Sequence, residues 1–214
     1  MAERVTLAGR YVRLEPLTVA HAADLAAAAV DRSTYAYTWV PDGPRGAEAY
    51  VADALAEEAA GNHLPFATVR LPDGAGGEQV VGSTRFIDTA PWQWPPWAAD
   101  RQRAGVPDAV EIGHTWLAAA AQRTVVNTEA KLLMLTHAFD TWEVYRVRLK
   151  TDARNARSRA AIERLGATLE GVLRAAQPAA DGTVRDTAMF SITAAEWPAV
   201  RADLRARLDR PRRG

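Results

Sequence analysis

Cysteine is absent from this 214-residue chain, and lysine occurs only as Lys131 and Lys150. The lack of cysteine excludes disulfide bridges, thiolate metal sites and a cysteine nucleophile. No apolar run reaches the roughly 18 residues of a membrane span, and the stretch before Gly9 lacks the apolar segment of a signal peptide. We therefore expect a soluble, cytoplasmic protein that does not bind a membrane.

A basic surplus is also missing, because acidic and basic residues balance at 26 each. Proteins that bind nucleic acid neutralise many phosphates, so this balance argues against such a partner, and only a local patch at residues 201–213 would contradict it. His21, His63 and His137 show no metal-ligand spacing. We expect no metal site.

The length and the 48% hydrophobic content suit one globular domain over residues 1–214. Periodicity and turn residues predict strands and helices in alternation. The expected strands are 10–17, 66–71, 79–88, 109–117, 145–151, 168–176 and 185–192, and the expected helices are 21–30, 46–60, 128–143, 156–165 and 194–208. This order predicts an α/β (α+β) fold, a mixed sheet with helices on both faces.

Residues 89–108 combine three tryptophans, Trp92, Trp94 and Trp97, with four prolines. No long periodic element passes through such a proline density, so we predict a long ordered loop or a lid. Clustered aromatic side chains on a loop form either a binding surface for a substrate or a packing plug. Both interpretations stay open.

The segment from Glu111 to Thr128 reads as a strand, a loop and the start of a long helix. A helix N-terminus carries unpaired N–H groups and the positive end of the helix dipole. The loop that begins at Gln122 is therefore a candidate cradle for phosphates.

Several motifs together resemble a known family. They are Glu-Ile-Gly-His-Thr-Trp-Leu at 111–117, Thr-Glu-Ala-Lys at 128–131, Asn155 with Ser158, Leu-Gly-Ala at 165–167 and Asp-Gly at 181–182. The chain resembles GNAT-superfamily N-acetyltransferases, in particular the RimJ/RimL-type branch of ribosomal-protein N-terminal acetyltransferases. The resemblance implies a mostly antiparallel central sheet that splays at its middle strands. It also implies acetyl-CoA as cosubstrate, no metal, and transfer of the acetyl group to a primary amine.

The resemblance assigns the pyrophosphate of acetyl-CoA to the loop and first helical turn, namely Gln122, Arg123, Thr124, Val125, Val126, Asn127 and Thr128. Val125 and Asn127 replace glycine or a similarly small residue of the family pattern. Valine does not tolerate left-handed dihedral angles, so Val125 requires ordinary helical or extended backbone. The resemblance also gives the backbone N–H groups of Trp116 and Leu117 to the thioester carbonyl, Asn155 to the coenzyme, and the coenzyme to a cleft near Trp116 and Tyr145.

The reaction needs a base for the ammonium and an acid for the leaving thiolate. Glu111 is our candidate base, and the alternative is a surface glutamate in a salt bridge. His114 competes with it, and strand alternation places His114 on the opposite face. The resemblance makes Ser158 the acid, because Ile162 stands where the superfamily commonly has tyrosine. Alternatively, Asn155 caps the helix and Ser158 is only its third residue.

The acceptor amine is less defined. The resemblance places acceptor contacts at Tyr35, Tyr37 and Trp39, and His114 and the three tryptophans of residues 89–108 are further candidates. These aromatic residues favour an apolar or aromatic acceptor, either a small amine such as an antibiotic or a protein N-terminus. A non-catalytic acyl-CoA-binding regulatory or scaffold protein of the same fold is the alternative function. The sequence leaves a homodimer open.

Overall fold

In a computed structural model, the chain forms an eight-stranded sheet with the strand order β1-β2-β3-β4-β5-β6-β8-β7. The structure describes residues 3–72, 77–89, 91–101, 103 and 105–210. The strands are β1 (Leu7–Ala8), β2 (Val12–Pro16), β3 (His63–Arg70), β4 (Gln79–Ile87), β5 (Ala109–Leu117), β6 (Arg146–Asp152), β7 (Thr168–Pro178) and β8 (Val184–Thr193). Neighbouring strands pair antiparallel except β5 and β6, which are parallel. This confirms the predicted mixed, mostly antiparallel sheet.

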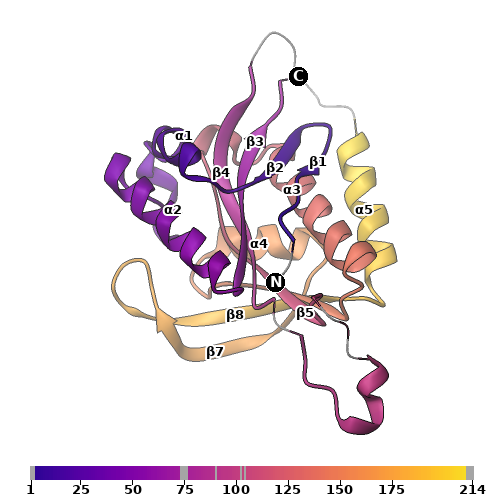
Figure 1. The fold of residues 1–214 in the computed structure, drawn as a ribbon. Coiled ribbons are helices and arrows are strands. Elements are labelled where there is room, and N and C mark those ends of the chain that lie inside the picture. The colour runs from indigo at the N-terminus through magenta and orange to yellow at the C-terminus, as the bar shows by residue number, and fades with distance from the viewer. Residues whose placement is uncertain (1–2, 73–76, 90, 102, 104, 211–214) are drawn as a thin grey trace.

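Helices cover both faces of the sheet, as predicted (Figure 1). They are α1 (Ala22–Ala28), α2 (Gly43–Ala59), α3 (Val125–Thr136), α4 (Ala156–Arg164) and α5 (Trp197–Asp209). Residues of α1 and α2 form one apolar core with the sheet, and residues of α3, α4 and α5 form a larger one on the other side. We call these sides the α2 face and the α3 face.

Most element boundaries agree with the sequence prediction to within three residues, and both predicted hairpins form. The largest difference is the expected helix 128–143, which begins earlier and ends at Thr136, followed by a π-helical turn at His137–Thr141. The turn at 181–182 forms as expected, with Gly182 at a φ of 78°. Of the turn residues predicted after β3, positions 73–76 lie outside the described residues.

The middle of the sheet opens between β5 and β6. These strands pair only where Ala109–Glu111 faces Arg146–Arg148. Beyond this point β5 continues along β4, and β6 continues along β8. The predicted splay is therefore present, and Glu111 lies at the last paired position before the gap.

A β-bulge lies on β5 beside this gap. The register between β4 and β5 shifts between Ser83 and Arg85, and His114 has a φ of 49°. A bulge adds one residue to its strand and reverses the alternation of side chains beyond it. Prediction by simple alternation therefore fails from His114 onward.

One buried carboxylate fixes α3 to the start of the sheet. Glu129 accepts hydrogen bonds from the backbone N–H groups of Arg10, Tyr11 and Val12 at 2.9, 2.6 and 2.7 Å. A Cβ at Gly9 would lie 2.5 Å from the Glu129 carboxyl carbon, so only glycine fits there. The glutamate of the Thr-Glu-Ala-Lys motif is thus a structural link that orients the N-terminal half of α3.

Candidate active site

A short bridge segment, residues 31–37, crosses the open end of the gap. The Gln122 side chain donates to Thr34 Oγ1 at 2.8 Å from the β5 side of the gap. From the other side, Arg157 of α4 donates to the Thr34 carbonyl, and the Arg154 guanidinium lies 5.1 Å from the Tyr37 ring centre. The bridge segment therefore connects the two halves of the splayed sheet, which sequence reasoning did not anticipate.

The end of β5 is held by side chains rather than by β6. The Leu117 carbonyl accepts from the Tyr35 hydroxyl at 2.9 Å and from Gln122 Nε2 at 2.8 Å. Gln122 is thus turned inward and serves the loop itself. The Ala118 amide donates to Val81 of β4 at 2.7 Å, and because successive amides of a strand point to opposite edges, the Leu117 amide points toward the gap.

The N-terminus of α3 follows directly. Thr124 is the N-cap, and its Oγ1 accepts from the Val126 amide at 3.3 Å. Val125 begins the helix with ordinary backbone, as predicted, whereas the positive φ of 60° falls on Arg123. The remaining first-turn amides, including that of Asn127, have no partner within a helix. With exposed Arg123 beside them, they form a site suited to an anion.

The start of α4 agrees with the capping interpretation. Asn155 Oδ1 accepts from the Ser158 amide at 3.0 Å. Ser158 is half-buried at the third helical position, and Ile162 packs in the larger core. Asn155 therefore stabilises the helix, and the structure leaves the Ser158 hydroxyl without an assigned role.

Glu111 is buried rather than on the surface, with 2% of its side chain exposed. Lys150 of β6 places its Nζ 3.1 Å from Glu111 Oε1, although their orientation is not that of a hydrogen bond. Burial raises the pKa of Glu111, and the positive charge of Lys150 opposes this rise. A carboxyl group that holds a proton more tightly than usual is better matched to proton transfer near neutral pH.

His114 lies on the same face as Glu111, which corrects the prediction. Val110 and Ile112 belong to the α3-face core, so Glu111 between them points to the α2 face. Past the bulge, Thr115 accepts from Lys131 of α3 at 2.6 Å, whereas the His114 ring lies 5.8 Å from that of His63.

The His114 ring is open to solvent at its edge, yet the surrounding protein and nearby Arg85 lower its pKa to about 4. The imidazole is neutral at pH 7 and a weaker base than an unperturbed histidine. His114 marks where solvent reaches this face of the sheet.

Two further residues of the α2 face, Arg85 and Tyr50, were missed from the sequence. Arg85 of β4 has the largest fully buried side chain among the described residues. Its guanidinium carbon lies 4.7 Å from the Tyr50 ring centre, and Tyr50 packs edge-on against Trp116 at 6.3 Å. The available signal was an arginine within the otherwise uncharged run Gln79–Ile87.

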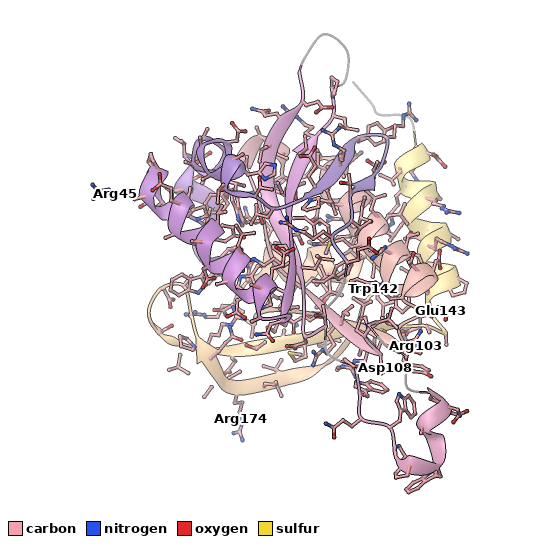
Figure 2. The ribbon with its side chains drawn as sticks, viewed as in Figure 1. Arg45, Arg103, Asp108, Trp142, Glu143 and Arg174 are labelled. Carbon is pink, nitrogen blue, oxygen red and sulfur yellow. The ribbon has the colours of Figure 1, made fainter. Side chains whose placement is uncertain are left out.

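The tryptophan loop, residues 89–108, projects away from the body of the protein (Figure 1). Among its described residues, Pro96–Arg101 form short 3-10 turns with a kink at Ala98, in agreement with the prediction that no long element passes through the loop. Asp108 holds the base of the loop, accepting from the Trp92 amide at 2.8 Å and from Trp94 Nε1 at 3.3 Å. Figure 2 shows Asp108 together with Arg103, Trp142 and Glu143, where Arg103 donates to the Trp142 carbonyl at 2.6 Å.

The tryptophans differ in their surroundings. Trp92 stacks on Tyr145 at 5.6 Å and also lines a cavity of about 500 Å³ with Arg146 and Arg148. Trp97 is 85% exposed on the loop, and Trp39 of the region after the bridge segment is 65% exposed. Trp92 and Trp94 thus show the packing contacts of one interpretation, whereas Trp97 is left exposed.

Tyr145 does not border the open gap. It precedes β6 at the paired end, where its amide donates to the Asp108 carbonyl at 2.8 Å. The expected coenzyme position near Trp116 and Tyr145 is therefore wrong for Tyr145, because parallel β5 and β6 separate only beyond Glu111 and Arg148.

No group of three or more His, Asp or Glu side chains in the described ranges could hold a metal ion. Within the same ranges, no helix has both the length and the apolar content needed to cross a membrane.

The chain is similar to a known protein family and to solved structures of acetyltransferases. Residues 12–168 match the family model of the acetyltransferase (GNAT) domain. A structure from T. thermophilus described as an acetyltransferase is 32% identical, covering 97% of this chain and 99% of that one, with a TM-score of 0.76. A GCN5-related N-acetyltransferase structure from Brucella melitensis is 28% identical over 95% and 85%, with a TM-score of 0.77.

A more distant structure, Mycobacterium smegmatis RimJ in complex with CoA-disulfide, is 23% identical over 95% of this chain and 92% of that one, with a TM-score of 0.71. At that identity the likeness concerns the fold alone. No curated protein matches the sequence.

Proposed function

The chain belongs to the GNAT acetyltransferase family, whose members transfer the acetyl group of acetyl-CoA, and we propose that its acceptor is a primary amine that attacks the thioester directly in a ternary complex. The observation that carries this proposal is the buried carboxylate of Glu111, at the point where β5 and β6 separate. A base at this position can take a proton from an ammonium, and only the neutral amine attacks a thioester.

The residues around the gap fit acetyl-CoA. The first-turn amides of α3 and the guanidinium of Arg123 would hold its pyrophosphate. The Leu117 amide, directed into the gap, would donate to the thioester carbonyl oxygen, where one such donor is worth about 3 kcal/mol once negative charge develops. Trp116 would line the acetyl group, and Asn155 and Ser158 would border the thiol end from α4.

Glu111 would act on the ammonium from the α2 face, and Lys150 would keep the carboxylate oriented. Its raised pKa brings the group closer to the working pH. His114, neutral and at the open edge of the face, would contact the incoming acceptor. Ser158 would position or protonate the leaving thiolate.

The substitution Glu111→Gln tests this proposal. We expect acetyl transfer at pH 7.5 to fall by roughly 10²–10³-fold, as for loss of a general base. Because burial raises the pKa of Glu111, we expect the acid limb of the wild-type pH–rate profile to lie above the ordinary glutamate pKa, and this limb should disappear in the variant. Glu163→Gln, at an exposed carboxylate of α4, is the matched control and should retain full activity. An unchanged pH–rate profile in Glu111→Gln would remove Glu111 as the base.

We also place the chain in the RimJ/RimL-type branch, as one cytoplasmic domain over residues 1–214. The motifs at 111–117 and 128–131 and the absence of cysteine support this assignment. The acceptor is then a small amine or a protein N-terminus. CoA release with panels of amines and peptides distinguishes these, and binding of acetyl-CoA without any CoA release would favour a non-catalytic acyl-CoA-binding protein.

A further inference from the structure

Arg85 is a buried cation whose hydrogen-bonding capacity is largely unused. A guanidinium has five N–H donors and stays charged inside a protein. Among the described residues, only Nη1 has polar neighbours, His63 Nδ1 at 3.5 Å and Asp53 Oδ2 at 3.7 Å. Asp53 is 71% exposed, so this long ion pair reaches into solvent. Nε and Nη2 have no hydrogen-bond partner among the described residues.

Other buried polar atoms lie on Tyr50, whose ring packs on this guanidinium, and on Trp116, whose ring packs on Tyr50. The Tyr50 hydroxyl and Trp116 Nε1 are buried and have no partner within the described chain. Tyr50 links them, since its ring contacts both the Arg85 guanidinium and the Trp116 ring. Buried polar groups in folded proteins are nearly always hydrogen-bonded, so a cluster of orphaned atoms indicates a missing partner. These atoms are predominantly donors, and the complementary ligand is an anion.

This cluster lies beside the proposed base. Arg85 pairs with Gly113, two residues from Glu111 on the same strand and face. A Cβ at Gly113 would lie 2.8 Å from Ile87 Cδ1 and 3.2 Å from Glu111 Oε1, so the Ile87 side chain and the Glu111 carboxylate both lie over Gly113, the residue paired with Arg85. His114, next along β5, is the exposed residue through which solvent reaches the group. An acceptor entering at His114 would meet Glu111 and Arg85 together.

We propose that Arg85 receives a carboxylate of the acceptor, so that the substrate is an amine that also carries a carboxylate, with its ammonium at Glu111. The inference rests on the proposed acetyl transfer and specifies its substrate class. It replaces the expectation of a purely apolar acceptor, because a buried guanidinium with free donors has no complement in a hydrocarbon. The carboxylate could be the main-chain group of a free amino acid or the side chain of an N-terminal Asp or Glu.

The test compares matched acceptors. CoA release is measured with free L-amino acids, with their amides, and with Asp and Glu amides, which retain only the side-chain carboxylate. We expect kcat/KM for a carboxylated amine to exceed that of its uncharged amide by about tenfold or more, as a charge-assisted bidentate bond provides. Activity with Asp and Glu amides but not with the other amides would mean that the side-chain carboxylate is the one recognised. Activity with free amino acids alone would mean that it is the main-chain carboxylate.

Arg85→Met should reduce the ratio of kcat/KM for the carboxylated amine to kcat/KM for its amide to about one. Arg85→Lys should restore part of this ratio, because lysine supplies a point charge. The methionine variant should fold, because replacing a buried charge by an apolar side chain of similar volume is often neutral or stabilising. Arg45→Met is the control: Arg45 lies on α2 and points into solvent (Figure 2), so its removal should leave rate and ratio unchanged.

The outcomes separate the two proposals. If acids and amides are acetylated equally well, or if Arg85→Met keeps the preference, the carboxylate inference is wrong while acetyl transfer stands. If no amine of the panel is acetylated although acetyl-CoA binds, the proposed function fails. The thermal shift produced by the carboxylated amines, compared with their amides in wild type and Arg85→Met, then decides whether Arg85 binds a carboxylate.

Discussion

The two faces of the sheet hold buried charge in different ways. On the α3 face, Glu129 is saturated by the three backbone N–H groups of residues 10–12. On the α2 face, Arg85 and Glu111 are as deeply buried, but each retains atoms without a hydrogen-bond partner among the described residues. A saturated charge stabilises a fold, whereas an unsaturated one costs stability and is available to a ligand. We therefore expect the buried charge of the α3 face to serve the fold and that of the α2 face to serve a ligand.

Lys131 is a further buried charge, which has hydrogen-bond partners but no opposite charge in the described part of the chain. Its ammonium is buried on the α3 face and donates to Thr84 Oγ1 at 3.0 Å and Thr115 Oγ1 at 2.6 Å. None of the salt bridges between described residues includes Lys131. It spans β4 and β5 at the bulge that sets the direction of the Leu117 amide. Burial lowers its pKa from 10.5 to about 7.

Substitution of Glu129, the buried charge whose hydrogen bonds are all made, should have the largest effect on stability. Glu129→Ala leaves several backbone N–H groups without an acceptor, and we expect the free energy of unfolding to fall by about 2–4 kcal/mol. Urea unfolding measures this as a lower midpoint at an unchanged slope. Glu48→Ala, at an exposed glutamate of α2, should change stability by less than about 0.5 kcal/mol. Equal effects of the two substitutions would break the comparison.

Substitution of Lys131 should change the free energy of unfolding in the opposite direction to Glu129→Ala, and by less. Between its folded pKa of about 7 and its unfolded value of 10.5, the unfolded chain binds more protons, so stability rises with pH. The slope is at most about 1.4 kcal/mol per pH unit. Lys131→Met should abolish this rise and be more stable than the wild type at pH 7 by roughly 1–2 kcal/mol. Urea unfolding at pH 7 and pH 9 measures both, and a methionine variant that loses stability at pH 7 would contradict this account.

The smallest effect is expected at the exposed Trp97. Trp97→Ala should change the free energy of unfolding by less than about 0.5 kcal/mol, because the side chain packs on little. Steady-state kinetics then shows whether the loop contacts the acceptor: an increase of KM for the amine would mean that it does. Trp92→Ala, which removes the stacking on Tyr145, should be the more destabilising of the two.

Much of the fold could be predicted from the sequence, whereas the candidate site could be predicted only in part. Periodicity and turn chemistry predicted the order of the elements, and the side-chain chemistry of Asn155 predicted a cap that the structure contains. Glu111 was singled out, but neither its burial nor its pairing with Lys150 of β6 could be inferred from its own strand. Arg85 escaped notice because one arginine in a strand is ordinary until its burial is known.

The sequence by itself determined the features that neighbouring residues control: the cap at Asn155, the turn at 181–182 and the succession of strands and helices. Only the tertiary structure decided which face each polar side chain occupies. The bulge at His114 depends on the register between β4 and β5, and Gln122 turns inward because Thr34 lies across the gap. Hydrogen bonds and burial of this kind join residues that are distant along the chain, and no local pattern records them.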